Sequence, residues 1–126
     1  QHVYVLESPE ALAAMDAASP CRYGAPVALV ITYDKNNVYT YSDGVTESGM
    51  EDVTIVATHM MLQAAALGVD SCWINKYDRA ALRQALQLPE NEEDVLILDL
   101  GFAEEGTGPK PNHDVRKPLS ETGTRR

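Results

Sequence analysis

The residues whose side chains could do chemistry are few and widely spaced. His2, His59 and His113 stand far apart, and none has a carboxylate or a second histidine at the spacing of metal ligands. Cys21 and Cys72 form no CxxC pair, so we expect neither a zinc site nor a disulfide framework. The sequence also lacks a Walker loop, a GxGxxG motif and a GxSxG motif. These patterns predict no metal site and none of the usual nucleotide or hydrolase sites.

Cys72 leaves one alternative open, a thiol enzyme. Asp70 and His59 lie near enough in the sequence to be considered as its partners. A cysteine on a buried strand is more often inert. Activity that is sensitive to iodoacetamide and requires Cys72 would favour this alternative.

Two further segments carry groups that bind ligands. The turn Trp73-Ile74-Asn75-Lys76-Tyr77 follows a predicted buried strand, where backbone amides can donate to a planar heterocycle. The segment HDVRKP contains Arg116 and Lys117, whose side chains can bind a phosphate. On the residues alone, a strand end and a solvated arm without a ligand is the simpler interpretation.

These segments are arranged around one long apolar helix. Ser48 and Glu51 have the S-x-x-E spacing of a capping box, which predicts the helix start. From Val53 to Leu67 apolar residues cover nearly the whole circumference, so we expect the helix to be buried on all sides. A chain of this size would have trouble enclosing it alone, which predicts that a second chain packs on it. The helix is too short and too interrupted for a membrane span, and Gly68 should end it.

Short strands and helices alternate along the rest of the chain, which predicts an α+β fold, a layered α/β arrangement of sheet and helices. Strands are expected at Val3 to Leu6, Val27 to Tyr33, Val69 to Ile74 and Val95 to Phe102, with a candidate edge strand at Val38 to Tyr41. Ser8 and Asp78 should N-cap two shorter helices. Ala103 to Arg126 should be an extended arm. We expect one domain, 1-126.

The charge of the chain excludes some partners. The formal net charge is -9, whereas a surface that binds nucleic acid or an anionic membrane needs clustered positive charge. The two unpaired cysteines and the absence of a targeting signal in QHVYVLES predict a cytoplasmic protein. Half of the ten lysines and arginines fall in the last 17 positions: Lys110, Arg116, Lys117, Arg125 and Arg126.

Several stretches, taken together and in order, resemble the FMN-dependent nitroreductase family. They are YGAP before a buried strand, the helix and strand SGMEDVTIVATHMMLQAAALGVDSCWINKYD, then LQLPENEE, LDLGF and PKPNHDVRKPLSE. The resemblance covers essentially the whole chain but only the C-terminal two thirds of a family member. Nothing corresponds to the family's N-terminal Arg-Ser-x-Arg phosphate-binding segment or its Pro-Ser/Thr-x-x-Asn-x-Gln loop. The resemblance therefore implies an N-terminally truncated nitroreductase-like domain.

The resemblance implies an obligate homodimer around the central helix, Ser48 to Leu67, with FMN at the interface. Backbone amides at Asn75 and Lys76 would bind the N5 and O4 edge of the flavin. Arg116 would bind the phosphate, with Lys117 as a second candidate. The implied cofactor-binding residues are Trp73, Ile74, Asn75, Lys76, Arg116 and Lys117. No catalytic side chain is expected, because the cofactor carries the chemistry.

The implied function is an FMN-dependent oxidoreductase that uses NAD(P)H to reduce nitro or quinone-like small-molecule acceptors by ping-pong hydride transfer. The alternative is a non-catalytic flavin-binding or dimerisation subunit, which the missing phosphate-binding segment favours. A yellow purified protein would favour the enzyme, since a structural partner could be colourless.

Overall fold

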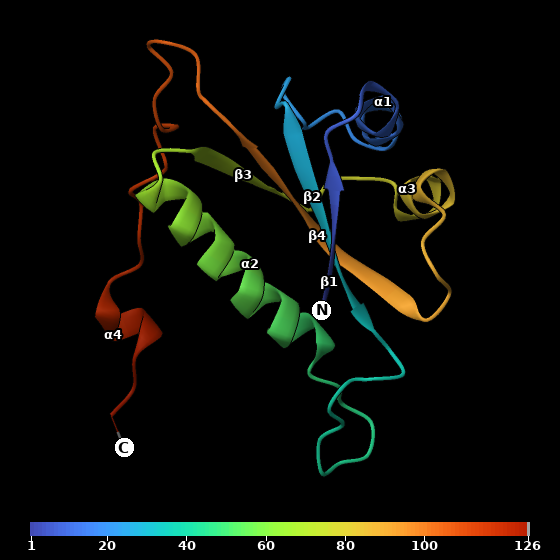
Figure 1. Ribbon diagram of the computed structural model, residues 1–126. Helices are drawn as coiled ribbons and strands as arrows, with labels where there is room; N and C mark the ends of the chain where they lie inside the picture. The colour runs from blue at the N-terminus through green and yellow to red at the C-terminus, as the bar shows by residue number, and fades with distance from the viewer. Residues whose placement is uncertain (126) are drawn as a thin grey trace.

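A computed structural model describes residues 1–125 as an antiparallel four-stranded sheet with helices on both faces (Figure 1). The strand order is β1-β2-β4-β3, and every neighbouring pair is antiparallel. The α+β fold expected from the sequence is therefore confirmed. The elements are β1 (His2–Leu6), α1 (Pro9–Ala18), β2 (Val27–Asp34), α2 (Gly49–Ala66), β3 (Asp70–Ile74), α3 (Arg79–Leu86), β4 (Glu92–Gly101) and α4 (Leu119–Thr122).

The two central strands, β2 and β4, are buried on both faces. Alternate side chains of a strand point to opposite faces, so each strand contributes to two hydrophobic clusters. Ile97 and Val30 pack with α1 and α3, whereas Leu96 and Leu98 pack with α2. Figure 1 shows α2 crossing one face of the sheet, with α1 and α3 lying together away from it. This arrangement explains why both strands are continuous apolar runs in the sequence.

The predicted caps of the two shorter helices are confirmed. The side chain of Ser8 accepts a hydrogen bond from the backbone N–H of Ala11 (3.2 Å), and Pro9 is the first helical residue. The side chain of Asp78 accepts from the backbone N–H of Ala81 (3.0 Å). These local signals set the starts of α1 and α3.

The start of α2 differs from the predicted capping box. The Ser48 backbone is already helical, and its hydroxyl donates to Asp52 (2.7 Å) rather than accepting from a backbone amide. The Glu51 side chain accepts from the hydroxyl of Tyr41 instead of returning to the cap. The first helical residue is Gly49, where an added Cβ would clash with the ring of Tyr33. The close approach of that ring therefore favours glycine at the start of the helix.

The expectation that α2 is buried on all sides is wrong for the single chain. Val53, Ala57 and Ala64 are buried against the sheet. The opposite side carries an exposed row at i, i+4, i+7 and i+11, which we call the outer stripe. The outer stripe consists of Ile55, His59, Leu62 and Ala66.

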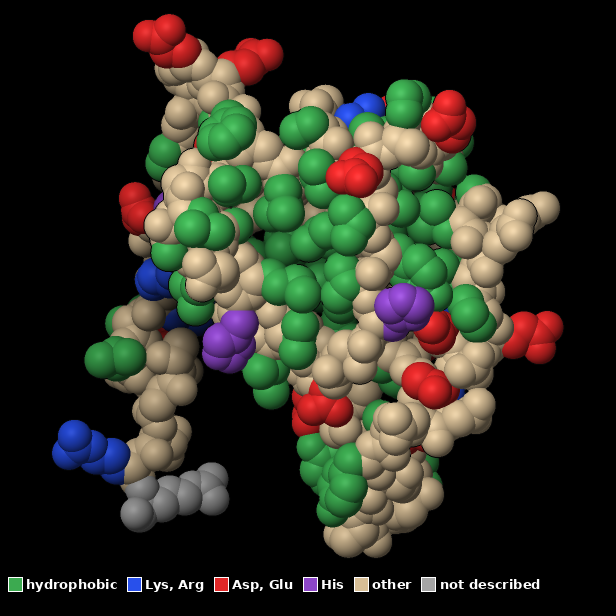
Figure 2. All heavy atoms as spheres, viewed as in Figure 1, with side chains coloured by type: hydrophobic (Ala, Val, Ile, Leu, Met, Phe, Trp, Pro, Cys, Tyr) green, Lys and Arg blue, Asp and Glu red, His purple; other side chains and the backbone are tan. Residues whose placement is uncertain are grey.

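The outer stripe belongs to a larger apolar surface. Ile55 is 56% exposed and Leu62 is 65% exposed. Figure 2 shows hydrophobic side chains gathered across the middle of this face of the molecule.

Gly68, at φ +75°, ends α2 in the left-handed conformation that the sequence predicted. Among residues 1–125, no helix has both the length and the apolar character needed to cross a bilayer.

Three other boundaries differ from the sequence prediction. β4 begins at Glu92 rather than Val95, so most of the expected acidic turn is strand, and the strand ends at Gly101. The candidate edge strand at residues 38–41 reduces to a single bridge between Thr40 and Glu47. The arm after β4 contains one short helix, α4.

A one-residue bulge explains why the acidic start of β4 belongs to the sheet. Ile31 pairs with Leu96, but the next residue, Thr32, pairs with Asp94, so Val95 is the extra residue. A one-residue shift moves the following side chains to the other face. The carboxylate of Asp94 consequently lies on the α3 side, where it is fully buried.

Asp94 holds α3 and the turn before it against β4. The hydroxyl of Tyr77 donates to its carboxylate (2.8 Å), as do the guanidinium groups of Arg79 (3.3 Å) and Arg83 (3.2 Å). Burial, together with this carboxylate, raises the pKa of the Tyr77 hydroxyl. The buried charge of Asp94 is thus satisfied by three donors from one short segment.

Asp94→Ala should lower the free energy of unfolding by about 1–3 kcal/mol, because it removes the shared acceptor of Tyr77, Arg79 and Arg83 and leaves the Tyr77 hydroxyl without its partner. Glu93→Ala is the matched control. The Glu93 side chain is 43% exposed and lies 4.0 Å from both Lys35 and Arg79, so its loss should cost less than about 1 kcal/mol. Urea unfolding measures both variants. Equal losses would show that the buried network does not stabilise the fold.

Candidate functional site

The turn after β3 is anchored from inside the sheet. β3 is an edge strand that pairs only with β4, and its last residue, Ile74, is buried opposite Ile97. The next two residues, Asn75 and Lys76, are exposed. Their backbone is therefore held at a fixed position while it remains accessible to a ligand.

Contacts with α1 fix the other side of the turn. The backbone carbonyl of Lys76 accepts a hydrogen bond from the buried hydroxyl of Ser19 (2.8 Å). The backbone N–H of Asp78 donates to the carbonyl of Ala18 (2.8 Å). The turn is consequently tied to the C-terminal end of α1 as well as to β4.

Two backbone donors in this turn remain available. Within residues 1–125, the backbone N–H groups of Asn75 and Lys76 have no hydrogen-bond acceptor. The Asn75 side chain accepts from the indole N–H of Trp73 (3.1 Å), which turns its oxygen toward the strand. Neighbouring N–H groups on a rigid strand end can donate to acceptor atoms along the edge of a planar ring. Backbone N–H groups can donate to a ring in this way regardless of the side chains at Asn75 and Lys76.

The structure does not bring all the sequence-predicted site residues together. Trp73, Ile74, Asn75 and Lys76 form one continuous unit at the end of β3. The C-terminal arm, which carries Arg116 and Lys117, runs outside α2, away from the turn that leads into α3 (Figure 1). Within one chain these two groups of residues are therefore separate.

The arm residues are exposed and bonded only locally. One guanidinium nitrogen of Arg116 donates to the carbonyls of His113 (2.5 Å) and Val115 (2.9 Å). Lys117 is exposed. An exposed guanidinium that contacts only nearby carbonyls can exchange them for a phosphate.

The structure does not support the thiol alternative. Cys72 pairs with Asp99 across the β3–β4 ladder, on the sheet face opposite α2. His59 lies on α2, where its Nδ1 is 2.7 Å from the carbonyl oxygen of Ile55. The Asp70 carboxylate accepts from the backbone N–H of Ala103 (2.8 Å). Cys72 is exposed at the sheet edge, but partial desolvation, with Asp99 nearby, raises the pKa of its thiol and so lowers the fraction of nucleophilic thiolate.

Sequence reasoning missed two polar groups near these sites. Ser19, which supports the turn, follows a helix end in the sequence, and nothing in its neighbours marks it as buried. Asp99 is the only acid inside the run VLILDLGF, and a charged residue in a predicted buried strand is a signal that could have been followed.

Comparisons with known proteins identify the fold and the family. Residues 2–102 match the family model described as the nitroreductase family. A nitroreductase family protein from Clostridium difficile 630 is 31% identical, with a TM-score of 0.88 over 98% of this chain and 72% of that chain. No curated protein matches the sequence.

Two more distant structures share the fold. An FMN-dependent nitroreductase from Clostridium difficile R20291 is 23% identical, with a TM-score of 0.71 over 99% of this chain and 75% of that chain. An FMN complex of a protein from Exiguobacterium sibiricum 255-15 is 16% identical, with a TM-score of 0.81 over 99% of this chain and 76% of that chain. The match over residues 2–102, together with the 31% identical relative, places the chain in a known family. This chain belongs to the nitroreductase family.

Proposed function

We propose that the chain binds FMN and acts as an oxidoreductase that uses NAD(P)H to reduce a nitro or quinone-like acceptor. Membership of the nitroreductase family supports a general oxidoreductase role. The observation that carries the proposal is the pair of unpaired backbone N–H groups at Asn75 and Lys76. FMN is named in the descriptions of two proteins with this fold, which supports the choice of cofactor.

The residues of the turn fit the edge of a flavin ring. Bound FMN would supply the hydride chemistry, whereas the protein binds and orients the ring. The two N–H groups suit ring acceptor atoms, and the exposed ammonium of Lys76 adds positive charge beside them. Trp73 and the buried Ile74 hold the strand end that presents these donors. No side chain in the turn is needed as an acid or a base.

We further propose that Arg116 and Lys117 bind the phosphate of an FMN whose ring lies at another chain's turn. Each chain's own arm lies away from its own turn, so the two groups can meet at one cofactor only if a second copy contributes. The arm is exposed along its whole described length, as a segment that packs on a partner would be when seen alone. A homodimer would thus complete the site.

The proposed dimer surface is the outer stripe of α2. Burying an apolar side chain of this size contributes roughly 1.5–3 kcal/mol, so Ile55 and Leu62 from both copies would stabilise a dimer substantially.

We keep a cytoplasmic location as part of the proposal, supported by the two free thiols, Cys21 and Cys72.

Backbone binding of the flavin can be tested at Asn75. Asn75→Ala should leave FMN affinity within about twofold, because the N–H donor remains, whereas Asn75→Pro removes that donor and should weaken binding at least about tenfold. Titration followed by flavin fluorescence measures both. Loss of binding in the alanine variant would mean that the side chain makes the contact.

FMN binding without NAD(P)H oxidation would favour a non-catalytic flavin-binding subunit.

Dimerisation can be tested by placing a charge on the outer stripe. Leu62→Glu should shift the protein from dimer to monomer at micromolar concentration, because a charge buried at the interface has no partner. Thr54→Glu is the control, since Thr54 is exposed on α2 outside the stripe. Met60 is less suitable because it packs on the chain's own core. Sedimentation that shows a wild-type monomer, or a dimer unaffected by Leu62→Glu, would rule out this surface.

A further inference from the structure

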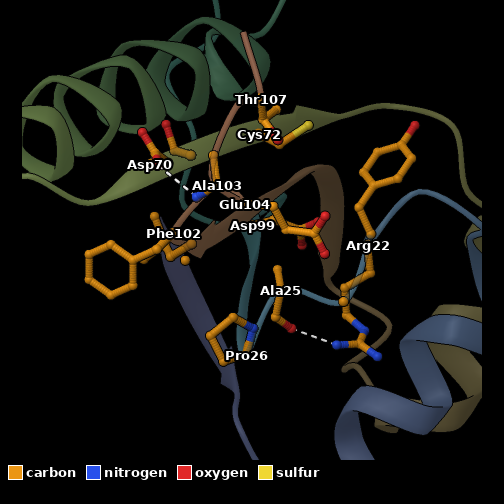
Figure 3. A pocket seen from close by; sticks show the side chains of 15 residues that line it. Arg22, Ala25, Pro26, Asp70, Cys72, Asp99, Phe102, Ala103, Glu104 and Thr107 are labelled. Atoms are coloured by element: carbon orange, nitrogen blue, oxygen red, sulfur yellow. Dashed lines mark hydrogen bonds between the residues drawn. The ribbon is translucent and has the colours of Figure 1, made fainter.

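A hollow lies on the sheet face opposite α2, beside the first half of β3. Its volume is about 500 Å³. The walls come from the loop between α1 and β2, the start of β3, the end of β4 and the beginning of the arm (Figure 3). It is separate from the turn that we propose to hold the flavin. None of its side chains has a role in the proposed function.

A buried carboxyl group without a partner forms part of this hollow. Asp99 is only 2% exposed, and neither of its carboxylate oxygens has a hydrogen-bond partner among the described residues. Figure 3 shows its side chain pointing into the space between Arg22 and Cys72. Buried polar atoms are nearly always paired, so an unpaired carboxylate needs an explanation.

The nearest cation is already engaged. Arg22 donates from Nε and Nη2 to the two carboxylate oxygens of Asp16 (2.7 and 2.5 Å). Its remaining Nη1 donates to the carbonyl of Ala25 (2.5 Å). The guanidinium therefore lies close to Asp99 but directs its hydrogen bonds elsewhere. The donors that Asp99 lacks must come from outside this cluster.

The rest of the lining suits a flat, positively charged molecule. Ala25 and Pro26 give an apolar wall, and Glu104 adds negative charge at the exposed edge. Tyr23 lines the opening and is 76% exposed, so its side chain has room to move aside and admit a ligand. Among residues 1–125, no three His, Cys, Asp or Glu side chains are grouped to hold a metal ion. The cation that fits is an organic one.

We propose that this hollow binds a small amidine or guanidine, whose two N–H groups donate to the two carboxylate oxygens of Asp99. Paired N–H donors on one carbon match a carboxylate in a two-bond arrangement. The ligand would supply the hydrogen bonds that the protein does not, and its positive charge would compensate the buried negative one. The site is independent of the flavin proposal.

Binding should depend on pH through Asp99. Burial raises the pKa of this carboxyl to about 7, and the cationic ligand pairs with the ionised form. The ionised fraction is about one tenth at pH 6 and about nine tenths at pH 8, so affinity should fall about tenfold between pH 8 and pH 6. The titratable and charged groups around Asp99 are Asp16 on α1, Cys21, Arg22 and Tyr23 on the following loop, Asp70 and Cys72 on β3, and Glu104 and Lys110 after β4.

Calorimetric titration of benzamidine into the full chain tests the proposal. We expect one site per chain at pH 8, with binding about tenfold weaker at pH 6. Asp99→Asn should weaken binding at pH 8 at least about tenfold and remove the pH dependence. Glu104→Gln removes an exposed charge from the same hollow and should change affinity by less than about threefold. No binding to the wild type, or equal binding to Asp99→Asn, would overturn the proposal.

Stability measurements show whether the Asp99→Asn variant is folded. Because the folded state keeps a proton on Asp99 that the unfolded chain releases above about pH 4, the contribution of Asp99 to stability falls as pH rises through about 7. Asp99→Asn should therefore gain stability relative to the wild type between pH 5 and pH 8. If this variant does not fold, the wild type decides the matter, since benzamidine affinity that is equal at pH 6 and pH 8 would overturn the proposal.

Discussion

The constraint on which this structure depends is the bulge in β4. The strand lies between β2 and β3 and is covered by helices on both faces, so a charged acid buried on it is costly unless donors reach its carboxylate. The extra residue, Val95, moves Asp94 to the α3 side, where donors from α3 and its preceding turn reach it. Without that shift the carboxylate would face the apolar side of α2. The position of α3, and of the turn before it, follows from this one local irregularity.

Two acids on β4, Glu92 and Asp99, show how hydrogen-bond donors decide the direction in which a buried carboxyl's pKa shifts. Although burial raises the pKa of Glu92, hydrogen bonds from His2, Thr32 and Tyr4 outweigh it and lower that pKa. The partners lie 2.7 to 2.9 Å away. Asp99 has no such partners, and burial raises its pKa to about 7. Burial favours the protonated form in both cases, so the donors make the difference.

Much of the fold could be predicted because its signals are local. The cap at Ser8, the cap at Asp78 and the left-handed Gly68 each depend on residues within one turn of chain. The start of β4 could not be predicted, because the residues that satisfy Glu92 lie 60 to 90 positions away in the sequence. A cluster of acids near Pro89 therefore resembled a turn. The capping-box prediction was wrong for a related reason, because the hydroxyl of Tyr41, in the preceding loop, donates its hydrogen bond to the Glu51 carboxylate.

The candidate flavin site was less accessible to sequence reasoning. The position of the turn after β3 suggested backbone donors for a planar ring, but the assignment of Asn75 and Lys76 to a flavin came from the family resemblance, because free backbone donors leave no mark in a side-chain pattern. The supporting hydroxyl of Ser19 could be recognised only once α1 and the turn were seen to touch. Asp99 was visible as an acid in an apolar run, but its lack of partners depends on where Arg22 directs its hydrogen bonds.

The packing of β3 on β4 also separates the two proposed sites. Cys72 lies opposite Asp99, whereas Ile74, which ends the strand before the flavin turn, lies opposite Ile97. Ile74 and Ile97 are both buried in the cluster under α1 and α3, so an apolar layer stands between Asp99 and the contacts that hold the turn. Substitutions at positions that share no partners usually act independently. Removing the charge of Asp99 should therefore leave the N–H groups of Asn75 and Lys76 in place, and each site can be altered without dismantling the other.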